Sequence, residues 1–281
     1  MNTKHESMLA VLVAATCLSG FGYAQEAMYT AAATMPSKNT FVIRPQFHVY
    51  QFGTNPSSDV ETTRKYEFAT KLDYGLARAW SMSIEVPVVY EEETLPDGEN
   101  ENDIGVEDFD LMFKYRLYKY DSGGVDTLRI ALMGGAKITS GDSDKFASQS
   151  VNPHMGIVLT LVRGRWGFNQ EFSYTFNTGG SEATNFGGDG PSDAFAYNSA
   201  LLYRIDPPNF TSTSKGAWYV TGEMVGLYET NGDNDIRFAP GVMYEGTKFA
   251  FELMAQLPVY DSLSRRAELD WGVGVGFRFA F

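Results

Sequence analysis

Large apolar and polar residues alternate along almost the whole chain after residue 40. In FVIRPQFHVYQF, at residues 41–52, one face carries Phe41 and Phe47. The opposite face of the same stretch carries Arg44 and His48. An alternation with a period of two is typical of β-strands that have one apolar and one polar face. No segment after residue 40 shows the apolar spacing of a helix, so the pattern predicts an all-β protein.

The alternation defines a series of strands whose lengths suit a membrane. Each is about 10 to 14 residues long, the length with which a tilted strand crosses a bilayer. We predict a single transmembrane antiparallel up-and-down β-barrel of about 12 strands over residues 41–281, with 10 or 14 strands as the alternatives. The predicted strands lie near residues 41–52, 64–74, 80–90, 105–118, 125–139, 153–162, 165–177, 194–205, 217–229, 235–244, 249–260 and 269–281.

Short and long connections alternate between these strands. RGR and DSGG are short, whereas EEETLPDGENEND and TGGSEATNFGGDGPS are long and polar. Short turns on one side and long loops on the other are typical of outer-membrane barrels. Two connections depart from the pattern: DPPNFTSTSK is long for the short side, and NGDN is short for the long side. At these places either the predicted number of strands is wrong or the barrel is locally irregular.

The apolar face is expected to point outward, towards lipid. A soluble sandwich or soluble barrel would alternate in the same way with its apolar face inside. Here, however, that face is almost uniformly large, and aromatic residues gather at one level, as in an interfacial girdle. That level carries Trp80, Trp166, Trp218, Tyr74, Tyr203 and Tyr244.

The first 24 residues have the features of a cleaved signal peptide. An apolar stretch from Met8 to Phe21 precedes small residues at Gly22 and Ala24, so the mature chain is expected to start near Gln25. The segment 25–40 would then be a periplasmic lead or a plug in the lumen. A signal peptide for export, together with strands that can form a membrane barrel, predicts a location in the outer membrane.

The polar face would line the lumen. The positive and negative side chains on this face are nearly equal in number, although the whole chain carries a net charge of -13. Besides the candidates named below, the count includes Lys65, Lys137, Glu67, Asp73, Glu223 and Asp270. Paired ions could fill a narrow interior, or they could line an aqueous path for small polar or amphipathic solutes. The lumen-lining candidates are Arg44, His48, Lys71, Glu85, Asp108, Asp110, Lys114, Arg116, Arg129, Glu171, Arg204, Arg237, Glu252 and Arg278.

The excess acid is concentrated in the loops, above all in residues 91–103. We expect a solvated external loop there, with divalent-cation binding as the alternative, because carboxylate clusters suit Ca²⁺. The spacing of these carboxylates matches no EF-hand loop. The acidic balance also argues against a nucleic-acid partner, since phosphate backbones require a basic surface.

Three further features concern the barrel wall. Pro87 and Pro258 lie inside predicted strands, where proline removes a ladder hydrogen bond. Each is expected to mark a bulge, with a lateral opening for apolar substrates as the alternative. The last strand ends on Phe277, Phe279 and Phe281, a pattern that resembles the signal recognised by the barrel-assembly machinery.

The sequence does not indicate an enzyme. After residue 24 the histidines are His48 and His154, and neither begins a His-x-Ser pattern of the phospholipase barrels. A lumenal His–Asp pair of the protease-barrel type stays open. There is no phosphate loop, metal-ligand cluster or nucleophile elbow, so we expect no cofactor and no metal.

Two segments resemble a known family. DIGVEDFDLMFKYRLY is similar to a strand of the outer-membrane proteins labelled as transporters of the meta-pathway of phenol degradation, with one residue of slippage near Glu107. DYGLARAWSMSIEVPVVY resembles a hairpin of that family, with Ala77-Arg78 in place of the usual turn Asp, and YEGTKFAFELMAQLPVY repeats its shape. The matching positions are Gly105, Asp108, Lys114, Tyr115, Tyr74, Gly75, Leu76, Trp80 and Pro87.

The resemblance implies an outer-membrane channel for uptake of small organic compounds, aromatic or amphipathic ones among them. It brings no established catalytic or ligand residues. A barrel without transport function, serving as a wall or a surface-interaction element, is the alternative. The expected partners are outer-membrane lipids and lipopolysaccharide, the barrel-assembly machinery and a small-molecule solute.

Overall fold

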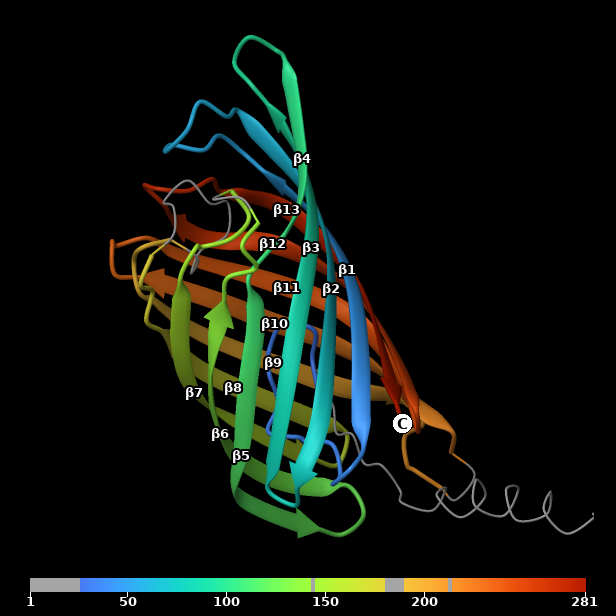
Figure 1. Ribbon diagram of the computed structural model, residues 1–281. Helices are drawn as coiled ribbons and strands as arrows, with labels where there is room; N and C mark the ends of the chain where they lie inside the picture. Colours follow the sequence, from blue (N-terminus) through green and yellow to red (C-terminus); the bar gives the residue numbers. More distant parts are fainter. Residues whose placement is uncertain (1–25, 143–144, 180–189, 212–213) are drawn as a thin grey trace, which may run out of the picture.

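The computed structural model describes residues 26–142, 145–179, 190–211 and 214–281. The predicted signal peptide, residues 1–24, therefore lies outside the described residues. Within those ranges the chain forms thirteen strands in one antiparallel sheet that closes on itself (Figure 1). No helix in the described part of the chain is long and apolar enough to cross a membrane.

The strands follow one another as neighbours around the barrel, so the topology is a meander. Their bounds are β1 Phe41–Phe52, β2 Thr62–Ala77, β3 Trp80–Thr94, β4 Asn100–Val106, β5 Phe109–Ser122, β6 Asp126–Ile138, β7 Val151–Arg163, β8 Trp166–Thr175, β9 Ala194–Asp206, β10 Gly216–Glu229, β11 Asn234–Gly246, β12 Phe249–Ser262 and β13 Leu269–Ala280. The all-β fold is confirmed, and the predicted strands each match one of these within a few residues.

The first and last strands close the barrel. β1 pairs with β2 on one side and with β13 on the other, where His48 lies opposite Gly274. At the end of this seam, the amide of Phe281 donates to the carbonyl of Phe41 over 2.9 Å, and the two rings stack with centroids 4.9 Å apart. The pairing of β1 with β13 closes the sheet, which suits a lipid environment because hydrocarbon does not tolerate a row of unpaired edge groups.

The predicted count of 12 corresponds to 12 positions around the wall, because β4 and β5 share one of them. Both strands pair with β3, β5 through Asp110 opposite Glu85 and β4 through Val106 opposite Val88. The chain bulges between them at residues 107–108, and the Glu107 amide donates to the carbonyl of Pro87 over 3.1 Å. The structure is therefore a closed 12-strand barrel with one extra strand.

The acidic stretch 91–103 differs from the expected irregular loop. β3 continues to Thr94 and β4 begins at Asn100, so most of this stretch is a β-hairpin that projects beyond the barrel (Figure 1). Charged side chains lie on both faces of the hairpin, so the alternation that revealed the other strands is missing. Within the described residues, no three His, Cys, Asp or Glu side chains are placed to hold a metal ion.

The two connections of unexpected length do not disturb the barrel. β9 pairs with β10 from Ala194 opposite Glu229 to Asp206 opposite Trp218, with a single register shift. β10 then pairs with β11 along its whole length from Gly216 opposite Gly246. The irregularity therefore lies in the lengths of the links, and the strand count is correct here.

Outward-facing aromatic side chains mark one level of the barrel, at the short-hairpin end. Three tryptophans that are 42–52 % exposed each meet a tyrosine of the neighbouring strand. The ring centroids lie 4.7 Å apart for Trp80 and Tyr115, 4.5 Å for Trp166 and Tyr203, and 5.2 Å for Trp218 and Tyr244. Such pairs suit the interface between hydrocarbon and water, where an apolar ring body and a polar tip are both favoured.

The interior is polar, as expected for a membrane barrel with its apolar face outward. Lys65, Glu223 and Arg278 are each at most 3 % exposed, although all three carry formal charges. Such groups are tolerated when they are paired and hydrogen-bonded.

The two prolines expected to mark bulges, Pro87 and Pro258, lie at irregularities of the wall. Pro87 lies where the partner of β3 changes from β5 to β4. Pro258 pairs with Arg237 next to a register shift between β11 and β12. Beyond Gln256, β12 is no longer paired with β13.

Candidate lumenal site

Residues 26–36, which we call the inner segment, lie inside the barrel before the chain enters β1 (Figure 1). Ala32 and Ala33 are completely buried, and Thr30 is 1 % exposed. The inner segment is therefore packed among the side chains of the barrel wall.

A single carboxylate holds the middle of the inner segment. Glu223, on β10, accepts hydrogen bonds from three consecutive backbone amides. Met28 donates over 3.0 Å, Tyr29 over 3.1 Å and Thr30 over 2.7 Å. Because hydrogen bonds to a charged acceptor are stronger than neutral ones, this contact fixes the backbone of the segment to the wall.

Further contacts hold the rest of the inner segment on other strands. Ala31 donates its amide to Glu171 over 3.0 Å, and Ala33 donates to the hydroxyl of Thr160 over 2.8 Å. The ammonium group of Lys114 donates to the carbonyl of Ala32 over 2.7 Å. The segment is thus bound through its backbone to several sides of the lumen.

The start of the inner segment joins a cluster of ion pairs. Arg44 Nη1 lies 2.9 Å from Glu26 Oε1, and Arg278 Nη2 lies 2.7 Å from Glu252 Oε1. The two arginines also donate to backbone carbonyls, Arg44 to Ala27 over 3.1 Å and Arg278 to Glu26 over 2.9 Å. The cluster offsets the cost of burying these charges and ties the segment to β1, β12 and β13.

Small wall residues leave room for the inner segment. Ala33 packs against Ala131 and Val158, and Met28 packs against Ala239. Gly274 on β13 is also needed, because a Cβ there would lie 2.7 Å from the sulfur of Met28 and 2.6 Å from the ring of His48. The lumen wall is therefore shaped to the segment it contains.

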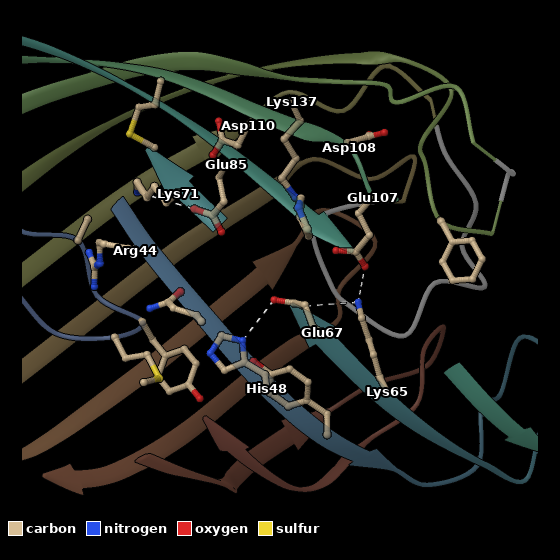
Figure 2. A pocket seen from close by; sticks show the side chains of 18 of the residues that line it. Arg44, His48, Lys65, Glu67, Lys71, Glu85, Glu107, Asp108, Asp110 and Lys137 are labelled. Atoms are coloured by element: carbon tan, nitrogen blue, oxygen red, sulfur yellow. Dashed lines mark hydrogen bonds and ion pairs between the residues drawn. The ribbon is translucent and has the colours of Figure 1, made fainter. Parts of the chain in front are cut away.

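A cavity of about 430 Å³ lies between the inner segment and the loop that follows β6. Its walls come mainly from β1, β2 and β3, and the β6–β7 loop contributes residues 145–148. Figure 2 shows charged side chains from these elements converging on it. A cavity of this size accommodates a small organic molecule.

Ion pairs connect the side chains around the cavity. Lys65 is held by Glu107 and lies 3.7 Å from Glu67, whose carboxylate is 3.3 Å from Nδ1 of His48. On the neighbouring side, Lys71 Nζ lies 3.9 Å from Glu85 (Figure 2). The arrangement supplies hydrogen-bond donors and acceptors to a polar cavity.

The predicted lumen residues divide into three groups. Those that line the cavity are Arg44, His48, Lys71, Glu85, Asp108, Asp110 and Glu171. Those in contact with the inner segment or within the buried wall are Lys114, Arg237, Glu252 and Arg278. Those at the short-hairpin end of the barrel are Arg116, Arg129 and Arg204, which contact Arg78, Asp121 and Gly164 respectively.

Comparison with known proteins agrees with this architecture. The family described as "Putative MetA-pathway of phenol degradation" matches residues 57–270. The chain belongs to this family. Its segment DIGVEDFDLMFKYRLY forms the end of β4, the bulge and most of β5, so the slippage near Glu107 is the bulge itself. No curated protein sequence is significantly similar to the chain.

Solved structures share the fold of this member of the phenol-degradation family. An outer membrane channel from Pseudomonas putida F1 has a TM-score of 0.60 at 11 % identity, and the alignment covers 92 % of this chain and 100 % of the channel. The β domain of the Bordetella autotransporter BrkA has a TM-score of 0.50 at 12 % identity, with coverage of 87 % and 100 %. The fold is therefore that of an outer-membrane β-barrel.

Several cavity residues of this family member were not singled out from the sequence. Glu26 and Tyr29 come from the inner segment, which has no alternation to assign it to a face. Glu107 lies in the bulge, where the alternation slips, and Lys145 lies in a long loop. In the sequence, only the slippage of the family motif near Glu107 indicated an irregularity at the bulge.

The two described histidines each pair with a carboxylate. His48 meets Glu67, as above, and His154 Nε2 lies 2.9 Å from Asp110 Oδ1. The His–Asp pair that the sequence left open is therefore present, on β7 and β5. Such a pair orients an imidazole, a role that structural and catalytic sites share.

Proposed function

We propose that the protein is an outer-membrane channel for the uptake of small organic compounds. The observation that carries this proposal is the cavity of about 430 Å³ inside the barrel, lined by charged side chains between the inner segment and the β6–β7 loop. The family match and the fold shared with a channel of Pseudomonas putida support it. The role is transport, without an enzymatic step.

The proposal includes the route to the membrane. Residues 1–24 serve as a signal peptide, and Phe277, Phe279 and Phe281 serve as the signal for the barrel-assembly machinery. In the folded barrel these three rings face outward and are 37–57 % exposed. The outward aromatic belts then lie against lipid and lipopolysaccharide.

One observation favours a second candidate, a barrel that does not conduct. The inner segment fills part of the lumen and is bound on several sides, so the interior below the cavity is occupied. In the channel proposal this segment is a plug that moves during transport. In the alternative it is a permanent part of the wall.

Single-channel recording in a planar bilayer separates the two candidates. The folded full chain is expected to give small discrete conductance steps, and a variant without residues 26–36 is expected to give larger ones. Heat-modifiable mobility on a gel shows that both proteins are folded. Silence from both folded proteins would contradict the channel and favour the non-conducting barrel.

A further inference from the structure

The cavity carries more negative than positive groups. Eight acidic and five basic side chains line it, an excess of three carboxylates when histidine is neutral. The projecting β3–β4 hairpin adds further carboxylates, Glu92, Glu93 and Glu101 among them, beyond the end of the barrel that holds the cavity. A low-dielectric cavity with one sign of excess charge concentrates ions of the opposite sign.

The basic side chains around the cavity are largely occupied by the protein itself. Lys65 is bound to Glu107 and lies near Glu67. Lys145 donates to Glu93 over 2.8 Å and to Asp103 over 2.9 Å. An anionic ligand at Lys65 or Lys145 would have to displace these carboxylates.

His48 offers a buried acceptor at the cavity. It is 4 % exposed, and its Nδ1 faces Glu67, which favours the tautomer with the proton on Nδ1. Among the described residues, no atom forms a hydrogen bond with Nε2 of His48. A buried polar atom without a partner is unfavourable, so Nε2 is suited to accept a hydrogen bond from a ligand that carries a donor.

Aromatic rings flank this acceptor. The ring of Tyr29 lies 5.6 Å from that of His48, and the ring of Tyr50 lies 5.6 Å from it on another side. Tyr29 and Tyr50 both line the cavity. Tyrosine faces attract organic cations within about 6 Å of the ring centroid.

We propose that the cavity binds single-ring organic cations, with Tyr29 and Tyr50 contacting the ring or its ammonium group, His48 accepting a hydrogen bond and Glu85 supplying the negative charge. Glu85 has 32 % of its side chain exposed, more than Glu67, and faces the same space as His48 (Figure 2). The inference rests on the proposed channel function and specifies its substrate class.

The test uses three probes of nearly equal size and different charge: benzylammonium, benzyl alcohol and benzoate. Their affinities for the folded full-length protein in detergent are measured by isothermal titration calorimetry. Benzylammonium is expected to bind about tenfold more tightly than benzyl alcohol, and benzoate is expected to bind most weakly. Equal affinities, a preference for benzoate or no binding of any probe would overturn the inference.

Two variants locate the site. Glu85→Gln is expected to lower the affinity for benzylammonium about tenfold and to leave that for benzyl alcohol unchanged, because only a charge is lost. His48→Ala is expected to weaken both, since both probes donate a hydrogen bond. Glu99→Gln, on the exposed hairpin, is the control with the same change of charge and should bind like the parent. An unchanged affinity in Glu85→Gln would contradict the assigned site.

The calorimetry tests the cation site and the bilayer recordings test the channel, so each proposal can be overturned without the other. Binding with the expected order of affinities, combined with silence in the bilayer, would overturn the channel and leave the cation site standing. Conductance steps combined with equal affinities for the three probes would overturn the cation site and leave the channel standing.

Discussion

At the scale of single residues, Glu223 is the side chain that does most to hold the inner segment in place. Its two oxygens accept three backbone amides of the inner segment, and it is completely buried. A glutamine in its place would keep the volume but offer one oxygen and no charge, leaving buried amides without acceptors. The position of the inner segment therefore depends on one side chain of the wall.

Glu223→Gln is expected to loosen the inner segment while the barrel stays closed. The lost hydrogen bonds should cost about 3 kcal/mol of local stability. Amide hydrogen exchange at residues 28–30 should become faster, and conductance steps should become larger. Glu101→Gln, on the exposed hairpin, is the control and should change neither. Protection at residues 28–30 equal to that of the parent would show that Glu223 is not the anchor.

Alternation predicts which face a residue is on but not its height in the barrel. It placed Arg44, His48 and Glu85 on the lumen side, where they line the cavity. It placed Arg116 and Arg204 on the same face, yet these arginines bind carbonyls at the short-hairpin end. Height depends on strand tilt and register, which no local pattern in the sequence records.

At the scale of elements, the β3–β4 hairpin is the place where polar–apolar alternation no longer predicts a strand. Membrane strands were found because lipid and lumen impose opposite polarity on their two faces. Beyond the membrane both faces meet water, so β4 has no alternation and was expected as a loop. The hairpin contacts the β6–β7 loop through Lys145, which binds Glu93 on β3 and Asp103 on β4.

The Lys145 contact should persist at neutral pH and be lost at strongly alkaline pH. Partial burial lowers the pKa of Lys145, but hydrogen bonds to Glu93 and Asp103 outweigh this and raise the pKa above its ordinary value of 10.5. Because the folded pKa is the higher one, the attraction is fully present below pH 10.5 and is lost as the pH rises through the folded value. The hairpin should therefore stay attached across the neutral range.

Lys145→Met is expected to release the hairpin from the β6–β7 loop. Limited proteolysis within residues 95–99 should become several times faster, since local opening exposes the backbone. Lys119→Met removes a similar ion pair with Asp121, 2.7 Å apart, on a different strand, and is the matched control. Equal cleavage of the two variants would show that Lys145 does not restrain the hairpin.

At the scale of the whole molecule, closure between β1 and β13 makes the barrel. The strand number, the outward face and the closing role of the last strand followed from the sequence, because lipid imposes them on every strand. The position of the inner segment did not follow, because residues 25–40 obey no such constraint. Its contacts join distant parts of the chain, such as Thr30 and Glu223.

Deletion of Phe281 is expected to lower the yield of folded barrel severalfold. The deletion removes the two backbone hydrogen bonds with Phe41 and the stacked ring at the end of the seam. The folded fraction is read from heat-modifiable mobility on a gel. Phe47→Ala, which removes an outward ring of β1 that is 45 % exposed and keeps all backbone pairs, is the control. Equal yields from the two variants would contradict a special role for the terminal residue.

The inner segment is held chiefly by its main chain. Glu223, Glu171, Thr160 and Lys114 bind its amides and carbonyls, which every non-proline residue possesses. A substitution of Tyr29, whose side chain lines the cavity, can therefore alter the cavity without removing these backbone attachments. The wall therefore retains the segment mainly through its backbone, while the side chain of Tyr29 lines the cavity.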